Sequence, residues 1–131
     1  MMQQMKTQEI EAAAAFLRTK VNFPIQVAVV LGSGLSAFAE RLEKAVAVPY
    51  GTVPNFPQST VPGHSGRFVA GFLEDTSVRC MQGRVHFYEG YSMQQVSLGV
   101  RLMASLGVRP LILTNAAGAV NTAYKPGDFM L

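Results

Sequence analysis

The sequence predicts a single α/β domain, and three observations favour this fold class. A chain of 131 residues lies within the size range of one compact domain. Hydrophobic residues make up 49% and charged residues 15%, which excludes a disordered polyelectrolyte and favours a large buried interior. Apolar runs of strand length also alternate with stretches of helical periodicity. We therefore expect one unit, residues 1–131, in which helices cover a sheet.

The chain opens with an amphipathic helix that extends to Lys20. Thr7 is a suitable N-cap, and Glu9 lies in the first turn, where a negative charge is favourable. The apolar positions recur at helical spacing and are Ile10, Ala13, Ala14 and Leu17. We expect this stripe to cover one face of the sheet.

A strand, a tight glycine turn and a second helical segment follow. Residues 26–31 (QVAVVL) form an apolar, β-branched run that predicts a strand. The run ends at Gly32-Ser33-Gly34, and a helical pattern then continues to Glu43. Residues 48–66 contain four prolines among Ser, Thr and Gly, which disfavours regular helix and predicts an ordered loop.

The remaining elements are a hairpin, a helix and a last strand. Residues 67–73 and 77–82 are strand-like runs joined by a short polar turn, which predicts an antiparallel hairpin. Residues 92–106 carry an apolar stripe at helical spacing, closed by Gly107 at a C-cap position. Residues 110–114 predict a buried strand that runs into Asn115-Ala116-Ala117-Gly118.

Charge, cysteine content and hydropathy exclude several classes of protein. A net charge of +3 suits small anions but is far below the dense basic face of a nucleic-acid-binding protein. Cys80 is the only cysteine and has no CxxC or histidine cluster around it, so neither an intramolecular disulfide nor a metal site is indicated. The sequence has no signal-peptide pattern and no apolar run of about 18 to 20 residues. We expect a cytoplasmic protein without a metal, a nucleic-acid partner or a membrane partner.

Two stretches offer backbone groups to an anion. The turn at Gly32-Ser33-Gly34 lies between a strand and a helix, so its N–H groups and the Ser33 hydroxyl are open to a ligand. The turn matches neither GxGxxG nor the Walker pattern, and a plain strand-to-helix turn explains it equally well. Residues 114–121 (TNAAGAVN) end a strand in small residues, which lets a ligand approach the backbone. Tight packing without a ligand is the alternative there.

Residues 83–90 (GRVHFYEG) supply charged and hydroxyl donors. If the backbone is extended, Arg84, His86 and Tyr88 share one face, while Val85 and Phe87 point into apolar packing. An arginine fork suits phosphate oxygens, histidine donates a charge-assisted bond, and a tyrosine ring with its hydroxyl suits a sugar. A solvated strand edge is the alternative interpretation.

A further candidate is His64, in the stretch Gly63-His64-Ser65-Gly66-Arg67. A histidine between glycines on a loop suits a gate or a ligand contact. A solvated loop histidine explains this stretch as well, and Arg67 is also placed to start a strand.

Taken together, these motifs resemble the trimeric purine nucleoside phosphorylase family. The matching stretches, in the family's order, are VVLGSGL (29–35), GHSGR (63–67), MQGRVHFYEGYS (81–92), TNAAGAVN (114–121) and PGDFML (126–131). The resemblance implies a mixed, largely parallel twisted sheet flanked by helices, in a subunit that assembles as a homotrimer. It also implies a roughly equal further stretch after Leu131, so residues 1–131 are identified as the N-terminal part of one phosphorylase domain.

The resemblance also implies roles for individual residues. The positions that match the family's phosphate site are Ser33, His64, Arg84, His86 and the backbone of Ala116, with His64 closing over the anion. Arg84 and His86 are the expected catalytic residues. Tyr88 matches a ribose contact, and the backbone at Ala117 and Gly118 matches the segment along the purine. Ser36 and Ala119 replace glycines of the family pattern with other small residues.

The implied activity is phosphate-dependent cleavage of the N-glycosidic bond of purine (deoxy)ribonucleosides, a reaction of purine salvage. It yields the free base and (deoxy)ribose 1-phosphate, with phosphate as co-substrate and no cofactor. The base-reading residues are expected beyond Leu131, so we expect the chain alone to be inactive. Two alternatives are a methylthioadenosine phosphorylase, which GHSGR disfavours, and a phosphate-binding or trimer-forming fragment without turnover.

Overall fold

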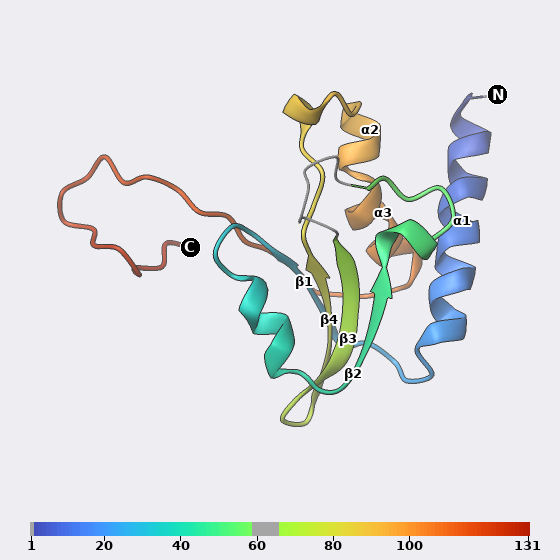
Figure 1. Ribbon diagram of the computed structural model, residues 1–131, viewed down its shortest axis with the longest axis horizontal. Coiled ribbons are helices and arrows are strands. Elements are labelled where there is room, and N and C mark those ends of the chain that lie inside the picture. Colours follow the sequence, from blue (N-terminus) through green and yellow to red (C-terminus); the bar gives the residue numbers. More distant parts are fainter. Residues whose placement is uncertain (1, 59–65) are drawn as a thin grey trace.

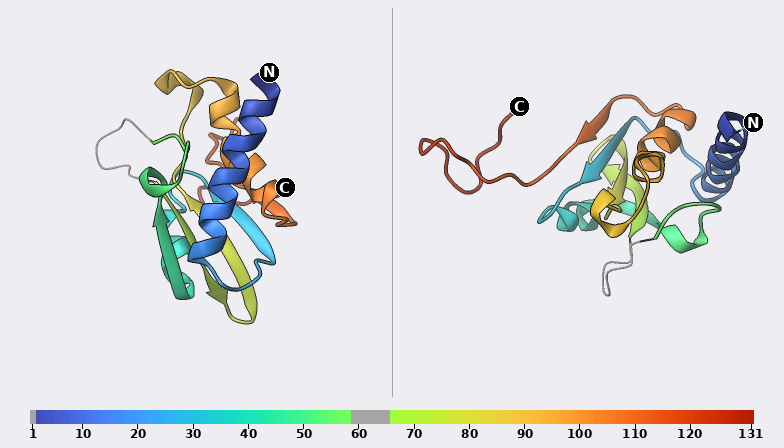
Figure 2. Two further views of the ribbon diagram at one scale, coloured as in Figure 1. Left: turned by 90° about the vertical axis from the view of Figure 1, so that its right-hand side faces the viewer. Right: turned by 90° about the horizontal axis from the view of Figure 1, so that it is seen from above.

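The computed structural model describes residues 2–58 and 66–131 as one sheet covered on both faces (Figures 1 and 2). The elements, in which η marks a 3₁₀ helix, are α1 (Met2–Lys20), β1 (Val27–Leu31), η1 (Ser36–Arg41), β2 (Glu43–Pro49), η2 (Tyr50–Thr52), β3 (Arg67–Leu73), β4 (Thr76–Gln82), η3 (Phe87–Glu89), α2 (Met93–Val96), α3 (Leu98–Ser105) and β5 (Leu111–Leu113). Helices α1 and α3 pack on one face, and η1 packs on the other.

The sheet has five strands in the order β2-β3-β4-β1-β5. Strand β1 pairs in parallel with β4 and β5, while β3 pairs antiparallel with β2 and β4. The predicted mixed α/β sheet is confirmed, with two parallel and two antiparallel pairings. In this register Leu31 lies opposite Gln82, and Val30 lies opposite Leu113, so the carboxyl ends of β1, β4 and β5 meet at one edge.

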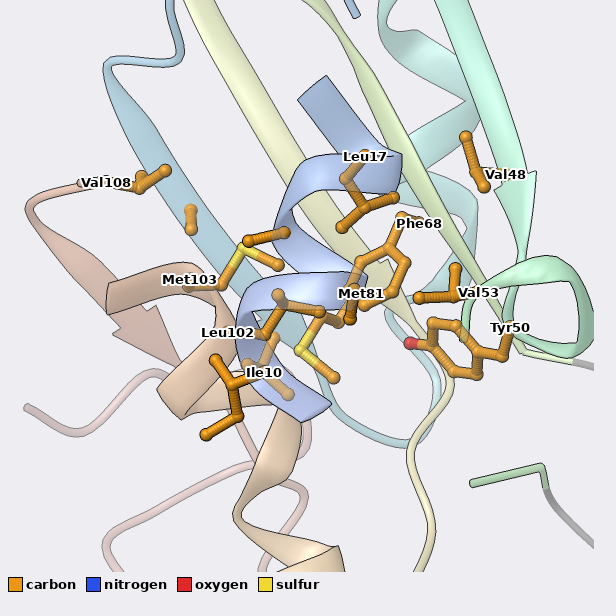
Figure 3. Close-up of a cluster of buried hydrophobic side chains, with 14 residues drawn as sticks. Ile10, Leu17, Val48, Tyr50, Val53, Phe68, Met81, Leu102, Met103 and Val108 are labelled. Atoms are coloured by element: carbon orange, nitrogen blue, oxygen red, sulfur yellow. The ribbon is translucent and has the colours of Figure 1, made fainter. Parts of the chain in front are cut away.

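The larger apolar cluster lies between the sheet and helices α1 and α3 (Figure 3). The predicted stripe of α1 is confirmed, because its four residues are all buried in this cluster: Ile10, Ala13, Ala14 and Leu17. They meet Phe68 of β3 and Leu102 of α3, which are also fully buried. Burial of a leucine or phenylalanine side chain contributes about 1.5 to 3 kcal/mol, so this cluster fixes α1 and α3 over the sheet.

Two helices differ from expectation, one in its start and the other in its continuity. Helix α1 begins at Met2, and Thr7 lies inside it, so the prediction of Thr7 as the N-cap is wrong. Residues 2–6 (MQQMK) have good helix propensity, so nothing in them stops the helix at Thr7. The predicted helix 92–106 is present as α2 and α3, joined at Ser97. Gly107 follows its end with φ +76°, and its N–H donates to Ala104 O at 2.9 Å, as a C-terminal glycine does.

The helical pattern predicted up to Glu43 is wrong in its second part. The chain forms only the short 3₁₀ helix η1, and Glu43 begins β2, a strand that the sequence did not predict. A bulge between Glu43 and Val46, with Lys44 at φ +50°, blurs the alternation of a regular strand. Gly71 of β3 permits this bulge, because a Cβ there would lie 2.7 Å from Glu43 O.

The hairpin of β3 and β4 is confirmed, but the predicted burial of the last strand is wrong. Strand β5 pairs with β1 alone among the described strands, and Ile112 and Leu113 are 47% and 62% exposed. It therefore forms an uncovered edge of the sheet in this chain. The segment after it, residues 115–131, is exposed throughout and runs away from the sheet (Figures 1 and 2). Among the described residues, no helix has the length and apolar character required to cross a membrane.

Candidate active site

Three of the candidate motifs meet at the carboxyl ends of the parallel strands. The glycine turn follows β1, residues 83–90 follow β4, and residues 114–118 follow β5. Because β1 lies between β4 and β5, these three segments leave neighbouring strands at the same edge. This edge is where open α/β sheets bind ligands.

The glycine turn is held tightly against the end of β5. The Gly32 N–H donates to Thr114 Oγ1 at 2.8 Å, and a Cβ on Gly32 would lie 2.8 Å from both Thr114 O and Asn115 Cα. Gly34 adopts φ +83°, and Leu35 N–H donates to Gly32 O at 3.1 Å. Both glycines are therefore required by the geometry of the turn, which leaves Ser33 exposed.

Arg84 connects the segment after β4 to the segment after β5. Its Nη1 donates to Thr114 O at 3.3 Å, and the residue is half-buried. A guanidinium group carries five N–H donors, so one bond to a carbonyl fixes its position and leaves donors for an anion. The structure thus brings Arg84 and the glycine turn to the same residue, Thr114.

His86 and Tyr88 share a face, as predicted, but not through an extended strand. Strand β4 ends at Gln82, and η3 begins at Phe87, which changes the side-chain period from two to about three. The imidazole of His86 stacks on the ring of Tyr88, with centroids 4.8 Å apart and 9° between the planes. Val85 is buried as predicted, whereas Phe87 is 64% exposed, so its predicted apolar packing is wrong.

The other predicted residues follow β5 or precede β3 in the sequence. Ala116, Ala117 and Gly118 are exposed in the segment that leaves β5. His64 lies outside the described residues. Gly66, which belongs to the same GHSGR motif, packs against the ring of Tyr50, where an added Cβ would lie 2.2 Å from a ring carbon.

Three residues that support the site were not singled out from the sequence. The first is Thr114, which binds both the glycine turn and Arg84. Tyr50 is buried, and its hydroxyl donates to Gly83 O at 2.5 Å, while its N–H donates to Gly66 O at 3.0 Å. Burial, with a smaller effect of Cys80, raises the pKa of Tyr50. Tyr50 therefore fixes Gly83, which precedes Arg84, and Gly66 of the GHSGR motif.

Gln82, the third of these residues, joins two elements at the same edge. Its Oε1 accepts from Arg67 Nε at 2.5 Å, and its Nε2 donates to Ser36 O at 2.9 Å. The side chain thus ties the start of β3 to η1, which follows the glycine turn. A glutamine at a strand end has no sequence signal that distinguishes this role from exposure to solvent.

Tyr50→Phe is expected to lower the free energy of unfolding by about 1 to 2 kcal/mol, because a partly buried carbonyl loses its donor. Urea denaturation followed by circular dichroism measures this change. Tyr124→Phe is the matched control, since Tyr124 is 44% exposed in the C-terminal segment, and its effect should stay within about 0.5 kcal/mol. Equal effects of the two substitutions would contradict the role given to the Tyr50 hydroxyl.

Two curated relatives of this chain are purine nucleoside phosphorylases. Purine nucleoside phosphorylase 1 of Geobacillus stearothermophilus is 52% identical over 122 residues, which cover 93% of this chain and 44% of that protein. The purine nucleoside phosphorylase of Rattus norvegicus is 47% identical over 124 residues, which cover 95% of this chain and 43% of that protein. The chain therefore spans less than half the length of these relatives.

A solved structure and a family profile extend the comparison to the fold and the superfamily. The crystal structure of isoform 2 of purine nucleoside phosphorylase from Schistosoma mansoni, in complex with cytosine and ribose-1-phosphate, superposes with a TM-score of 0.84 at 40% identity. The match covers 92% of this chain and 42% of that one. The profile of the phosphorylase superfamily matches residues 26–131, which include the three strand ends of the candidate site. The chain belongs to the phosphorylase superfamily.

Proposed function

We propose that this chain is the N-terminal part, residues 1–131, of a purine nucleoside phosphorylase domain. The proposed reaction is phosphate-dependent cleavage of the N-glycosidic bond of purine (deoxy)ribonucleosides, which gives the free base and (deoxy)ribose 1-phosphate. The observation that carries the proposal is the convergence of the glycine turn, Arg84 and the Thr114 segment at one edge of the sheet. The ribose-1-phosphate in the complex of the Schistosoma mansoni relative supports the same class of ligand.

The proposed phosphate site combines a guanidinium group with imidazole, hydroxyl and backbone donors. Its members are Ser33, His64, Arg84, His86 and the backbone of Ala116. The bond from Arg84 to the end of β5, together with the close approach of Gly32 to the same backbone, supports a common location for Arg84, Ser33 and Ala116. A planar guanidinium group suits phosphate oxygens because it presents paired N–H donors.

The nucleoside is proposed to lie next to the phosphate, with its sugar on the aromatic side of the site. Tyr88 is 80% exposed and stacked on His86, so its ring and hydroxyl are accessible to a ribose. We place the purine along the backbone of Ala117 and Gly118. Small residues there leave the backbone open to a flat base.

In the proposed reaction a phosphate oxygen bonds to the anomeric carbon as the glycosidic C–N bond breaks. The electron pair of that bond leaves with the purine nitrogen, which then takes up a proton. Phosphate is already anionic near neutral pH, so Arg84 and His86 contribute by aligning it rather than by removing a proton. As positive charge develops on the sugar, the aligned phosphate stabilises it.

Assembly, location and co-substrate form part of the proposal. We infer a homotrimer in the cytoplasm that serves purine salvage, with inorganic phosphate as co-substrate and without a metal or another cofactor. The order of the five matching motifs supports these inferences. Light scattering on the natural protein, with any sequence that follows Leu131, tests the trimer through its mass.

The proposed activity is tested by the products formed from inosine by the natural protein, with any sequence that follows Leu131. We expect hypoxanthine and ribose 1-phosphate in equal amounts, and only when phosphate is present. Methylthioadenosine as a second substrate separates the alternative phosphorylase, and we expect it to react more slowly. Release of free ribose in the absence of phosphate would show a hydrolase instead and contradict the proposal.

A further inference from the structure

The hydroxyl of Thr114 lies at the point where the three strand-end segments meet. We propose that Thr114 is a positioning residue of the phosphate site, whose hydroxyl fixes the glycine turn relative to Arg84. This inference rests on the proposed function, because it assigns the residue that gives the proposed phosphate donors their common geometry. Thr114 itself is not proposed to touch the anion.

The hydroxyl makes two hydrogen bonds at once, one in each direction. It donates to Val30 O at 2.7 Å and accepts from Gly32 N–H at 2.8 Å. These partners flank the last residue of β1, so the side chain holds the strand end and the first residue of the turn together. A hydroxyl can donate and accept in this way, whereas the isosteric valine can do neither.

The backbone of Thr114 makes two further hydrogen bonds, one to β1 and one to Arg84. Its N–H donates to Val30 O at 3.2 Å, which extends the β1–β5 pairing beyond β5, and its carbonyl accepts from Arg84 Nη1 at 3.3 Å. The glycine turn and the guanidinium group are therefore both bound to one residue. A shift of Thr114 moves both groups, and a loss of the hydroxyl releases only the turn.

These bonds also indicate which groups of the turn face a ligand. The Gly32 N–H is already bound to Thr114, so the turn is left with the groups of Ser33 and Gly34, both of which are exposed. Gly32 has little room to move, because its Cβ position lies 2.8 Å from the backbone of residues 114 and 115. We infer that the hydroxyl of Thr114 orients the Ser33 end of the turn toward the anion held by Arg84.

The test compares Thr114→Val with Thr114→Ser in the natural protein, with any sequence that follows Leu131. We expect Thr114→Val to raise the Kd and KM for inorganic phosphate roughly five- to tenfold, the size expected when the released turn loses one hydrogen bond to the anion, with the nucleoside KM changed less than about twofold. Thr114→Ser keeps the hydroxyl and should stay near the parent. Thr19→Val is the matched control, because its hydroxyl donates to Phe16 O at 2.6 Å on α1, and it should change neither constant.

A second readout follows the bond itself, independently of ligand. Amide hydrogen exchange should be slow at Gly32 in the parent and in Thr114→Ser, and fast in Thr114→Val. A Gly32 amide that exchanges in the parent as fast as an exposed one would overturn the inference, even if Thr114→Val does not fold.

Phosphate binding distinguishes a failure of the proposed function from a failure of the inference about Thr114. A parent protein that binds no phosphate contradicts the proposed function, and this inference with it. A parent that binds phosphate beside a folded Thr114→Val variant with the same phosphate constants contradicts this inference alone. If Thr114→Ser weakens phosphate binding as much as Thr114→Val does, the inference is also contradicted, because packing of the methyl group would then be the cause.

Discussion

Arg84→Ala is expected to weaken phosphate binding by roughly ten- to a hundredfold, because hydrogen bonds to a charged group contribute about 1.5 to 3 kcal/mol each. The substitution removes the cation that is bound to Thr114 O beside the glycine turn. Arg84→Lys should recover only part of the binding, since an ammonium group lacks the planar fork. Calorimetric titration with inorganic phosphate measures all three proteins.

Arg101→Ala is the matched control for this experiment. Arg101 is exposed on α3, on the face of the sheet that carries α1, so its loss removes the same charge away from the site. We expect its phosphate constant to equal that of the parent. A parent-like phosphate constant in Arg84→Ala would remove Arg84 from the site.

The chain of 131 residues by itself is expected to turn over no nucleoside, whereas the protein extended through its natural downstream sequence should cleave inosine. Phosphorolysis requires both an aligned phosphate and a group that protonates or hydrogen-bonds the departing purine. The described residues offer candidates for the first task, while Ala117 and Gly118 bring only exposed backbone to the second. Hypoxanthine release from inosine at saturating phosphate measures the difference.

The 131-residue chain and the extended protein should also differ in self-association, because of the exposed edge at β5. Ile112 and Leu113 are exposed on an edge strand, and such edges associate with other chains. We therefore expect the 131-residue chain to self-associate and the extended protein to do so less. For the turnover prediction, hypoxanthine release by purified 131-residue protein, free of host enzyme and at a rate that scales with phosphate, is the contradicting result. It would show that residues 1–131 also handle the departing purine.

Local patterns predicted most of the secondary structure. The stripe of α1, strand β1, the β3–β4 hairpin and the glycine after α3 each follow from periodicity or turn chemistry within a few residues. Strand β2 was missed because its bulge and the positive φ of Lys44 interrupt the alternation that identifies a strand. Its apolar residues Val46 and Val48, two apart, were the remaining signal.

The sequence indicated the proposed donors of the candidate site but not the residues that position them. Arg84 and the glycine turn stand out in the sequence because charge and glycine are informative locally. Thr114 bonds to Val30, which is 84 positions away in the sequence, and Tyr50 bonds to Gly83, which is 33 positions away. These pairings depend on strand order and register. His86 and Tyr88 were placed on one face for the wrong reason, since a 3₁₀ turn rather than a strand stacks their rings.

If the three strand ends form one phosphate site, phosphate in a crystal of the natural protein will bind at this edge of the sheet. We expect the anion within about 2.7 to 3.2 Å of donors from both Arg84 and the Ser33 end of the glycine turn. The Gly32 N–H should remain bonded to Thr114 in that complex. Phosphate bound elsewhere, or at this edge without Arg84 and the turn as donors, would contradict the claim.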